Sequence, residues 1–460
     1  MGRVNPTVLV AGIDAAGRPA HPALAEALAG AGLVVGAARH LAAVPVPPGC
    51  ATVVLGPLAP ALDRLAAAVA AGTPAVVLAS GDPGFFGIVR RLRAAGLPVR
   101  VLPAVSSVAA AFARAGLPWD GAAVVTAHGR DPRPALNACR ALPAVAVLTA
   151  SGAGAAELGA GLAGWDRRLV VAEHLGTPDE RITWTTPAEA AARTWADPHV
   201  MLSLAPETVP GRVALAPRPS RTVSTARKPA VAEDVARGLP GPPTGGADGT
   251  RAGDRPAVAR PSTAGAAGMR ADDQPAAAPA GGWALPESAY VHRDSMITKA
   301  EVRALAVARL RPRLGRLVWD VGAGSGSVGI ECALLGAAVL AVERDPDAPI
   351  RANAARHGVD VRVVTGAAPA ALVGLPDPDA VFVGGGGMDV LAAVADRRPP
   401  RVVVTLAALD RVAPAVHLLR AASYAVDGSQ LAAARLADLP GGSLRLAATN
   451  PVVLLTGELS

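Results

Sequence analysis

The sequence is poor in aromatic side chains and almost without lysine. Phe, Trp and Tyr make up 3% of the 460 residues, and only Lys228 and Lys299 among the 44 basic residues are lysine. Proteins that bind single-stranded nucleic acid interleave aromatic side chains with basic ones, and no such pattern is present. Hydrophobic residues nevertheless account for 51% of the chain, mostly as alanine, valine and leucine. That share excludes wholesale disorder.

Cysteine and long apolar runs are also scarce. Cys50, Cys139 and Cys332 lie far apart and form no C-x-x-C pair, so we expect neither a disulfide framework nor a metal site. Apolar stretches such as 65–81 are short and interrupted by Gly, Thr and Pro. Residues 1–10 lack the apolar length of a signal peptide. These absences predict a soluble, cytoplasmic protein that contacts no membrane.

The positive charge is unevenly distributed. A formal charge of +7 and a pI near 10.2 would suit a nucleic-acid partner. Residues 208–284, however, contain ten basic and six acidic side chains. Their net charge of +4 is more than half of the total of +7. The remainder of the chain is only mildly basic, which suits an anionic small molecule as well as RNA.

Proline and glycine divide the chain into three parts. Hydrophobic periodicity disappears over 207–284, where prolines are dense, so we expect a disordered linker there. Residues 1–206 alternate short apolar runs with alanine-rich stretches, which predicts α/β units on a largely parallel sheet. The strands expected there are 8–11, 33–36, 75–79, 99–102, 122–126, 145–149, 169–172 and 200–204. The helices expected there include 23–31, 61–71, 86–95 and 107–115.

Periodicity resumes over 285–460. We expect a helix over 298–310, capped by Thr298 with Glu301 three residues later. A βαβ series follows, with a glycine-rich turn after its first strand. Its strands are expected at 317–321, 338–342, 361–364 and 380–383, and its helices at 328–335 and 348–357.

The most specific motif is VWDVGAGSGSVG at 318–329. Alternate glycines between a strand and a helix let a ligand approach bare backbone and free N–H groups. The segment satisfies G-x-G-x-x-G, so a nicotinamide dinucleotide stays an alternative, as does a glycine-rich turn without ligand. Asp320 gives the D-x-G-x-G-x-G order found in class I methyltransferases. Glu343 ends the second strand and is placed to accept from both ribose hydroxyls of S-adenosylmethionine.

Further segments make residues 285–460 resemble the decarboxylating precorrin methyltransferases of cobalamin synthesis, which act at carbon 15. These segments are MITKAEVR at 296–303, AVER at 341–344, GAAP at 366–369 and NPV at 450–452. The resemblance implies a Rossmann-like class I fold and a pocket for S-adenosylmethionine. The residues it assigns to that pocket are Thr298, Gly322, Ala323, Gly324, Ser325, Gly326, Glu343 and Ala368. Ala367 stands where the family usually has Asp, and the glycines at 384–387 resemble a loop that admits a broad, flat substrate.

Residues 5–205 resemble the carbon-5 methylases of the same pathway, which have the two-lobed tetrapyrrole-methylase fold. The segments that carry the resemblance are VGAARHL at 35–41, LASGDPGFFGI at 78–88, PAVSSV at 103–108, HGR at 128–130 and EHLG at 173–176. It implies that the methyl donor lies near Gly12, Gly81, Asp82, Ser106 and Ser107. Asp14 stands where a glycine is usual, and it either narrows the approach to the backbone or bonds a loop amide.

Together the two resemblances imply methylation of precorrin-6B at carbons 5 and 15, with decarboxylation of the acetate on carbon 12. The partner would be an anionic tetrapyrrole rather than a nucleic acid, and we expect a homo-oligomer. No acid or base for decarboxylation is evident. The catalytic candidates are His128 and Arg130, which could position or protonate the macrocycle, together with His292 and with Lys299, which could contact a carboxylate; each also has an ordinary structural explanation. The competing hypotheses are an RNA methyltransferase and a tetrapyrrole-binding scaffold that has lost the donor.

Overall fold

The computed structural model describes residues 7–14, 17–19, 21–209, 282–293 and 297–460. The expected linker at 207–284 therefore falls largely outside the described residues. The parts on either side, 7–209 and 282–460, are taken in turn.

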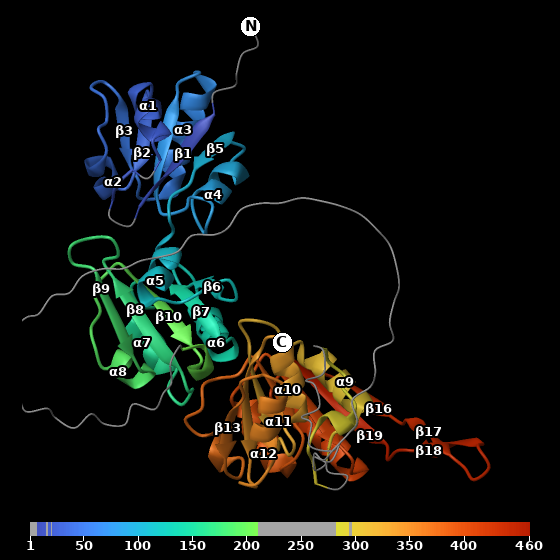
Figure 1. The fold of residues 1–460 in the computed structure, drawn as a ribbon. Helices are drawn as coiled ribbons and strands as arrows, with labels where there is room; N and C mark the ends of the chain where they lie inside the picture. The colour runs from blue at the N-terminus through green and yellow to red at the C-terminus, as the bar shows by residue number, and fades with distance from the viewer. Residues whose placement is uncertain (1–6, 15–16, 20, 210–281, 294–296) are drawn as a thin grey trace, which may run out of the picture. The chain divides into compact units, whose positions relative to one another are not determined.

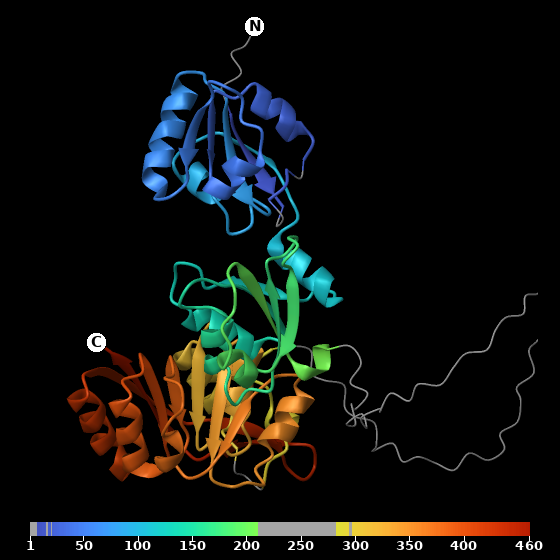
Figure 2. The same ribbon diagram turned by 90° about the vertical axis from the view of Figure 1, so that its left-hand side faces the viewer.

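The first sheet is fully parallel, with its strands in the order β3-β2-β4-β1-β5 (Figure 1). Its strands are β1 (Val8–Ile13), β2 (Leu33–Gly36), β3 (Ala51–Val54), β4 (Ala75–Ser80) and β5 (Val99–Leu102). The helices connecting them are α1 (Ala23–Ala29), α2 (Ala38–Ala43), α3 (Leu58–Ala70) and α4 (Val89–Ala94). Alternate residues of β1 enter separate cores: Val10 packs in the cluster of Leu65 on α3, and Leu9 in that of Leu24 on α1. Helices accordingly cover both faces of the sheet (Figure 2).

The second sheet has the order β6-β7-β10-β8-β9 and is mainly antiparallel. Only β6 and β7 pair in parallel, so the expected largely parallel arrangement is wrong for this part of the chain. Between β8 and β9 the connection at 174–180 is too short for the crossover of a dozen or more residues that parallel neighbours need, and β10 pairs with strands from earlier in the chain. The strands are β6 (Ala123–Thr126), β7 (Ala144–Leu148), β8 (Arg168–Glu173), β9 (Arg181–Thr185) and β10 (His199–Leu204). The helices are α5 (Ser107–Ala115), α6 (Arg133–Ala141), α7 (Ala155–Gly161) and α8 (Pro187–Ala191), with a 3₁₀ turn η1 (Pro206–Thr208).

The C-terminal part is built on a seven-stranded sheet in the order β13-β12-β11-β14-β15-β19-β16, and a β17–β18 hairpin extends from it (Figure 1). The first five strands are parallel, and β19 and β16 are antiparallel to their neighbours. The strands are β11 (Leu317–Val321), β12 (Ala338–Glu343), β13 (Arg362–Thr365), β14 (Ala380–Val383), β15 (Arg401–Leu406), β16 (Tyr424–Leu431), β17 (Ala434–Asp438), β18 (Leu444–Ala448) and β19 (Val452–Leu459). The helices are α9 (Ala300–Leu310), α10 (Ser327–Leu334), α11 (Ile350–Arg356), α12 (Gly387–Asp396) and α13 (Val412–Ala421), with 3₁₀ turns η2 (Glu287–Ala289), η3 (Ala370–Leu372) and η4 (Leu409–Arg411).

Strand β11 fixes the position of the C-terminal site. Its residue Trp319 packs in the cluster of α12 and α13, whereas Val318 packs in the cluster of α9 and α10 on the opposite face. The strand order reverses at β11, which lies between β12 and β14. In open α/β sheets ligands bind at such a point, outside the carboxyl ends of the strands.

One helix start differs from the prediction. Helix α9 begins at Ala300, and the residue in the N-cap position is Lys299, which makes no side-chain capping bond. The expected cap by Thr298 is therefore wrong. The backbone at Lys299 is extended, with φ −58° and ψ 146°, so Thr298 lies one residue too early to reach the first free N–H groups of the helix.

None of the helices among the described residues combines the length and apolar character that crossing a bilayer requires. No group of three or more His, Cys, Asp or Glu side chains within that part of the chain is arranged to hold a metal ion.

Candidate functional site

The loop between β11 and α10 depends on glycine. Gly322, Gly324 and Gly326 have φ values of +72°, +55° and +76°, a region that favours glycine. A Cβ on Gly326 would lie 2.8 Å from Cγ2 of Ile350, so there is no room for a side chain. The loop thus presents bare backbone at the start of a helix, which is what a close-packed ligand requires.

Asp320, on β11, connects the strand before this loop to the helix after it. Its buried carboxylate accepts a hydrogen bond of 2.8 Å from the N–H of Gly329, in the first turn of α10. The pKa of Asp320 is raised to about 7: burial raises it most, the hydrogen bond from the Gly329 N–H opposes the rise, and the charge of Glu343 adds to it. The acidic residue of the D-x-G-x-G-x-G pattern therefore fixes the strand to the helix.

Replacing Asp320 by asparagine is expected to reduce the pH dependence of stability. Folding raises the pKa of this carboxyl from 3.8 to about 7, so the folded protein binds more protons, and its free energy of unfolding falls as pH rises through that window. The slope is at most about 1.4 kcal/mol per pH unit. Urea unfolding at about pH 5 and about pH 8 should show the variant gaining stability relative to wild type at the higher pH. The same pH dependence in both proteins would contradict this assignment.

Glu343 connects β12 to the glycine loop. One carboxylate oxygen accepts from the Gly324 N–H at 2.8 Å, and the other accepts from the Asp345 N–H at 3.1 Å. Each oxygen keeps a further lone pair. The carboxylate is thus held in place at the end of the strand and can still accept from two hydroxyl groups.

The other residues predicted for this pocket gather around the same strand ends. The Gly366 N–H donates to the carbonyl oxygen of Glu343 at 2.8 Å, which brings the turn containing Ala368 beside Glu343. The side-chain amide of Asn353 donates to the carbonyl oxygen of Ser325 at 2.9 Å. Ala323 donates from its N–H to β12 at Val342.

A buried ion pair, not predicted from the sequence, anchors the segment that leads into α9. Arg303 and Glu331 are both fully buried, and Nε donates to Oε1 at 2.6 Å. Arg303 also donates to the carbonyl oxygens of Thr298 and Leu285, and Glu331 accepts from the Leu285 N–H and the Tyr290 hydroxyl. This network holds Thr298 at the base of α9.

His292 and Lys299 occupy two different positions near this pocket. Arg293 pairs with Asp345 at 2.8 Å, and the Val291 N–H donates to Asn353 at 2.8 Å. These two bonds place His292 beside the loops of Glu343 and Ser325. Lys299 is half-exposed in the N-cap position of α9, next to Thr298.

In the N-terminal part, Gly12 lies at the centre of the predicted site. A Cβ there would lie 2.3 Å from the carbonyl oxygen of Gly81 and 2.6 Å from the nitrogen of Ala104. Gly81 has φ +61° and donates to the carbonyl oxygen of Ile13 at 2.7 Å. The ends of β1 and β4 and the loop before α5 therefore lie too close together at Gly12 to admit a side chain there.

Replacing Gly12 by alanine is expected to lower any activity that depends on this site at least about a hundredfold, because the backbone of two loops must move to admit the methyl group. An activity that depends on the glycine loop at 322–326 should stay within about twofold of wild type in the same chain. Gly30 is the matched control, since a Cβ there meets nothing within 4 Å. Equal activity of the Gly12→Ala and Gly30→Ala chains would contradict the placement of this site.

The three other residues predicted here have visible local roles. The Asp82 carboxylate accepts from the Gly84 N–H at 2.8 Å, and the Ser106 hydroxyl caps α5 by accepting from the Ala109 N–H at 3.1 Å. Ser107 is the first residue of α5. Asp14 accepts from the Arg18 N–H at 2.7 Å, which confirms the alternative in which it bonds a loop amide.

A polar cluster at the end of β4 was not singled out from the sequence as a site. The Ser80 hydroxyl lies 3.0 Å from Nε2 of His40 and accepts from the Arg39 guanidinium at 2.9 Å. Burial lowers the pKa of His40, and the adjacent Arg39 lowers it further. The available signal was the polar pair Arg39-His40 just after a fully apolar strand, at the edge where ligands bind.

His128 and Arg130 are not joined to these glycines. Both are exposed in the loop between β6 and α6. The backbone N–H of His128 donates to the Thr126 hydroxyl at 3.1 Å. Within the described ranges, neither side chain makes a hydrogen bond or ion pair with Gly12, Gly81 or their neighbours.

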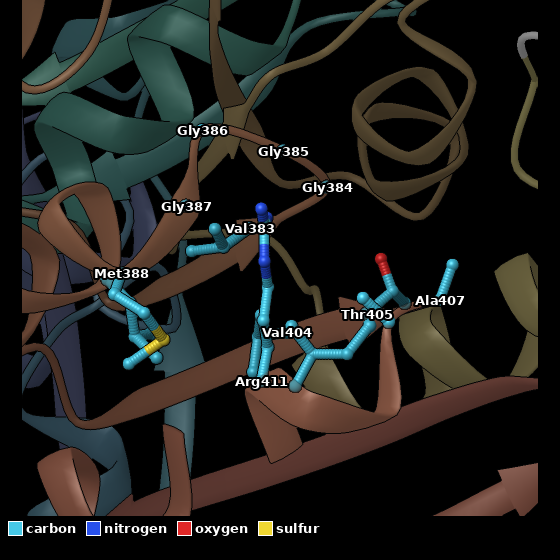
Figure 3. Close-up of a pocket in the computed structure, with 13 residues that line it drawn as sticks. Val383, Gly384, Gly385, Gly386, Gly387, Met388, Val404, Thr405, Ala407 and Arg411 are labelled. Atoms are coloured by element: carbon cyan, nitrogen blue, oxygen red, sulfur yellow. The ribbon is translucent and has the colours of Figure 1, made fainter. Parts of the chain in front are cut away.

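A cavity of about 210 Å³ lies at the carboxyl ends of β14 and β15 (Figure 3). The glycine turn at 384–387 forms one wall, with Met388, Thr405 and Arg411 around it. A Cβ on Gly322 would lie 3.0 Å from the nitrogen of Gly385. The cavity thus adjoins the loop after β11 across the backbone of this turn.

Comparison with known proteins identifies the family. A Pyrobaculum calidifontis protein, described as a probable cobalt-precorrin-6B C(15)-methyltransferase (decarboxylating), is 35% identical over 184 residues, which are 37% of this chain and 94% of that protein. The chain belongs to the precorrin methyltransferase family. The model of the precorrin methyltransferase domain matches residues 288–453, and that of the tetrapyrrole (corrin/porphyrin) methylases matches 22–192.

The descriptions of two further similar proteins name both carbon 5 and carbon 15. A Sinorhizobium protein described as precorrin-6Y C(5,15)-methyltransferase [decarboxylating] is 35% identical over 333 residues, covering 69% of this chain. The chain spans 63% of that protein's length. A crystal structure described as precorrin-6y C5,15-methyltransferase from Geobacter metallireducens is 32% identical, with a TM-score of 0.36, and covers 39% of this chain and 97% of its own.

Membership in the precorrin methyltransferase family implies a methyl donor of the S-adenosylmethionine type. The residues around Gly324 fit such a donor. They combine bare, left-handed backbone at a helix start with a carboxylate that is fixed at a neighbouring strand end.

Proposed function

We propose that this chain methylates precorrin-6B (precorrin-6Y) at carbons 5 and 15, removes the carboxyl group of the acetate on carbon 12, and so forms precorrin-8X. Residues 285–460 would act at carbon 15 and in decarboxylation, and residues 1–206 at carbon 5. The observation that carries this proposal is that crowded glycines lie near the carboxyl ends of parallel strands on two separate sheets: Gly12 is the last residue but one of β1, and Gly326 lies in the loop between β11 and α10.

In the C-terminal domain, the backbone of Gly322, Ala323, Gly324, Ser325 and Gly326 would hold S-adenosylmethionine, together with Glu343, Thr298 and Ala368. Bound there, this donor supplies an electrophilic methyl group. Glu343 would hold its ribose hydroxyls through charge-assisted hydrogen bonds. Because an in-line displacement at carbon needs mainly alignment and a dry pocket, the chain contributes position rather than a strong base.

In the N-terminal domain, the donor would lie against Gly12, Gly81, Asp82, Ser106 and Ser107. The contact of Gly12 with Gly81 and Ala104 leaves no room for a side chain at position 12. The Ser80–His40 cluster fixes the end of β4 directly before Gly81. The domain thus offers a rigid backbone surface for alignment of donor and acceptor.

His128 and Arg130 remain candidates for acceptor binding in the N-terminal domain, and His292 and Lys299 in the C-terminal one. Arginine suits bidentate binding of the carboxylates that a tetrapyrrole carries. The proposed setting is the cytoplasm, with the chain in a homo-oligomer.

The test is incubation of the full chain with precorrin-6B and methyl-labelled S-adenosylmethionine, followed by mass spectrometry of the product. The proposal requires a gain of two labelled methyl groups and the release of one carbon dioxide. A gain of one methyl group without carbon dioxide would refute the assignment of two activities.

A further inference from the structure

The cavity at the end of β15 contains a single charged side chain. Its lining residues are Val383, Gly384, Gly385, Gly386, Gly387, Met388, Leu391, Val404, Thr405, Leu406, Ala407, Ala408 and Arg411. Arg411 ends η4, the 3₁₀ turn that follows β15, and its side chain extends toward the glycine turn (Figure 3). A positive charge is therefore directed into a concave surface that is otherwise apolar or bare backbone.

This arginine is also unpaired. In the part of the chain that the structure describes, no carboxylate lies within 4.0 Å of its guanidinium, whereas Arg293, Arg397 and Arg401 of the same domain each pair with an acid at 2.7 to 2.8 Å. A guanidinium has five N–H donors in a planar fork that matches a carboxylate. Arg411 thus has its full capacity available for an anionic group of a ligand.

The surroundings of Arg411 fit a carboxylate on a broad apolar body. Thr405 contributes a hydroxyl to the same wall, and the glycine turn leads into the N-terminus of α12. Gly386 and Gly387 have φ +104° and +86°, so this wall carries no side chains. Met388 adds a polarisable apolar contact.

The carboxylate that Arg411 faces could come from two molecules in the proposed reaction. One is the donor, at its amino-acid end, and the other is the acceptor, which carries several carboxylates around its ring. None of the residues assigned to the donor lines this cavity. The backbone at Gly384 and Gly385 stands between them: the Gly384 N–H donates to the Val321 carbonyl oxygen at 2.9 Å, and Gly385 packs against Gly322. The position of the cavity favours the acceptor.

We propose that Arg411 binds a peripheral carboxylate of the tetrapyrrole. This inference rests on the proposed function of the C-terminal domain. It makes Arg411 a substrate-binding residue, not a group that exchanges a proton or forms a bond.

The experiment compares Arg411→Gln, Arg411→Lys and Arg420→Gln in the full chain. Arg420 is an exposed arginine on α13 that lies outside the cavity, so its variant loses the same charge. Carbon dioxide release is measured against precorrin-6B concentration, and S-adenosylmethionine binding by calorimetry. We expect Arg411→Gln to raise KM about tenfold to a hundredfold, with kcat and donor Kd within about twofold of wild type. Arg411→Lys should recover part of the loss, and Arg420→Gln should match wild type.

The outcomes separate the alternatives. An unchanged KM in Arg411→Gln, or a KM raised equally in Arg420→Gln, overturns the inference. A donor Kd that rises while KM stays constant assigns Arg411 to the donor carboxylate and also overturns it. If wild type releases no carbon dioxide, the proposed function fails. The binding of uroporphyrin, which carries eight carboxylates, then tests Arg411 alone: weaker binding by Arg411→Gln than by Arg420→Gln supports the site, and equal binding refutes it.

Discussion

Replacing Glu343 by alanine is expected to weaken S-adenosylmethionine binding in the C-terminal domain by about a hundredfold or more. Charge-assisted hydrogen bonds contribute about 1.5–3 kcal/mol each, and the proposed role gives this carboxylate two of them. The variant also loses the 2.8 Å bond that holds the Gly324 N–H. Carbon dioxide release and methylation at carbon 15 should fall together, and calorimetry should show the loss of one donor site.

The chain contains its own control for this prediction. Methylation at carbon 5, which is assigned to the Gly12 site, should stay within about twofold of wild type in the Glu343→Ala chain. Glu343→Gln keeps the shape and one accepting oxygen, so it should lose less affinity than the alanine variant. Unchanged methylation at carbon 15 in Glu343→Ala would show that the donor does not bind at this strand end.

Replacing Arg303 by leucine is expected to lower the free energy of unfolding by about 3–5 kcal/mol, because it leaves the Glu331 carboxylate buried without its cation. Both side chains are fully buried and 2.6 Å apart. Loss of the guanidinium also frees the carbonyl oxygens of Thr298 and Leu285. Urea unfolding measures the change through the midpoint at constant slope.

The pair Arg309–Asp427 gives the matched comparison. It joins two partly exposed side chains at 3.4 Å, so Arg309→Leu should cost less than about 1 kcal/mol. A double substitution of Arg303 and Glu331 by leucine should cost less than the sum of the single changes, since it leaves no unpaired charge. A loss below about 1 kcal/mol in Arg303→Leu would mean that the network is not anchoring the segment before α9.

Strands buried on both faces were predicted well from the sequence. The run at 317–321 is apolar apart from Asp320, and β11 has the expected bounds, as does β14. Strand β3 was missed because it is an edge strand with mostly exposed side chains, which removes the hydrophobic pattern. The predicted direction of the strands in the second sheet was wrong because β10 pairs with strands that lie well before it in the sequence, such as β8.

In the candidate site, the features that are local in sequence were predicted, and the contacts between distant residues were not. Glycine loops such as 322–326 are local in sequence, so their motif is visible before folding. The Arg303–Glu331 pair joins residues 28 apart, and the Ser80–His40 contact joins residues 40 apart. Arg411 became a candidate binding residue only because it lines a cavity formed by two strand ends and a turn. No local pattern carries such information, because tertiary packing creates it.

The most direct test of the whole account is the number of S-adenosylmethionine molecules bound per chain, measured by calorimetry on the full-length protein. Two donor sites are predicted in wild type. The Gly12→Ala and Glu343→Ala chains should each retain one site, and the chain with both changes should retain none. A single site in wild type, or loss of the same site in both variants, would contradict the proposal that two separate sheets each carry a methyl-donor site.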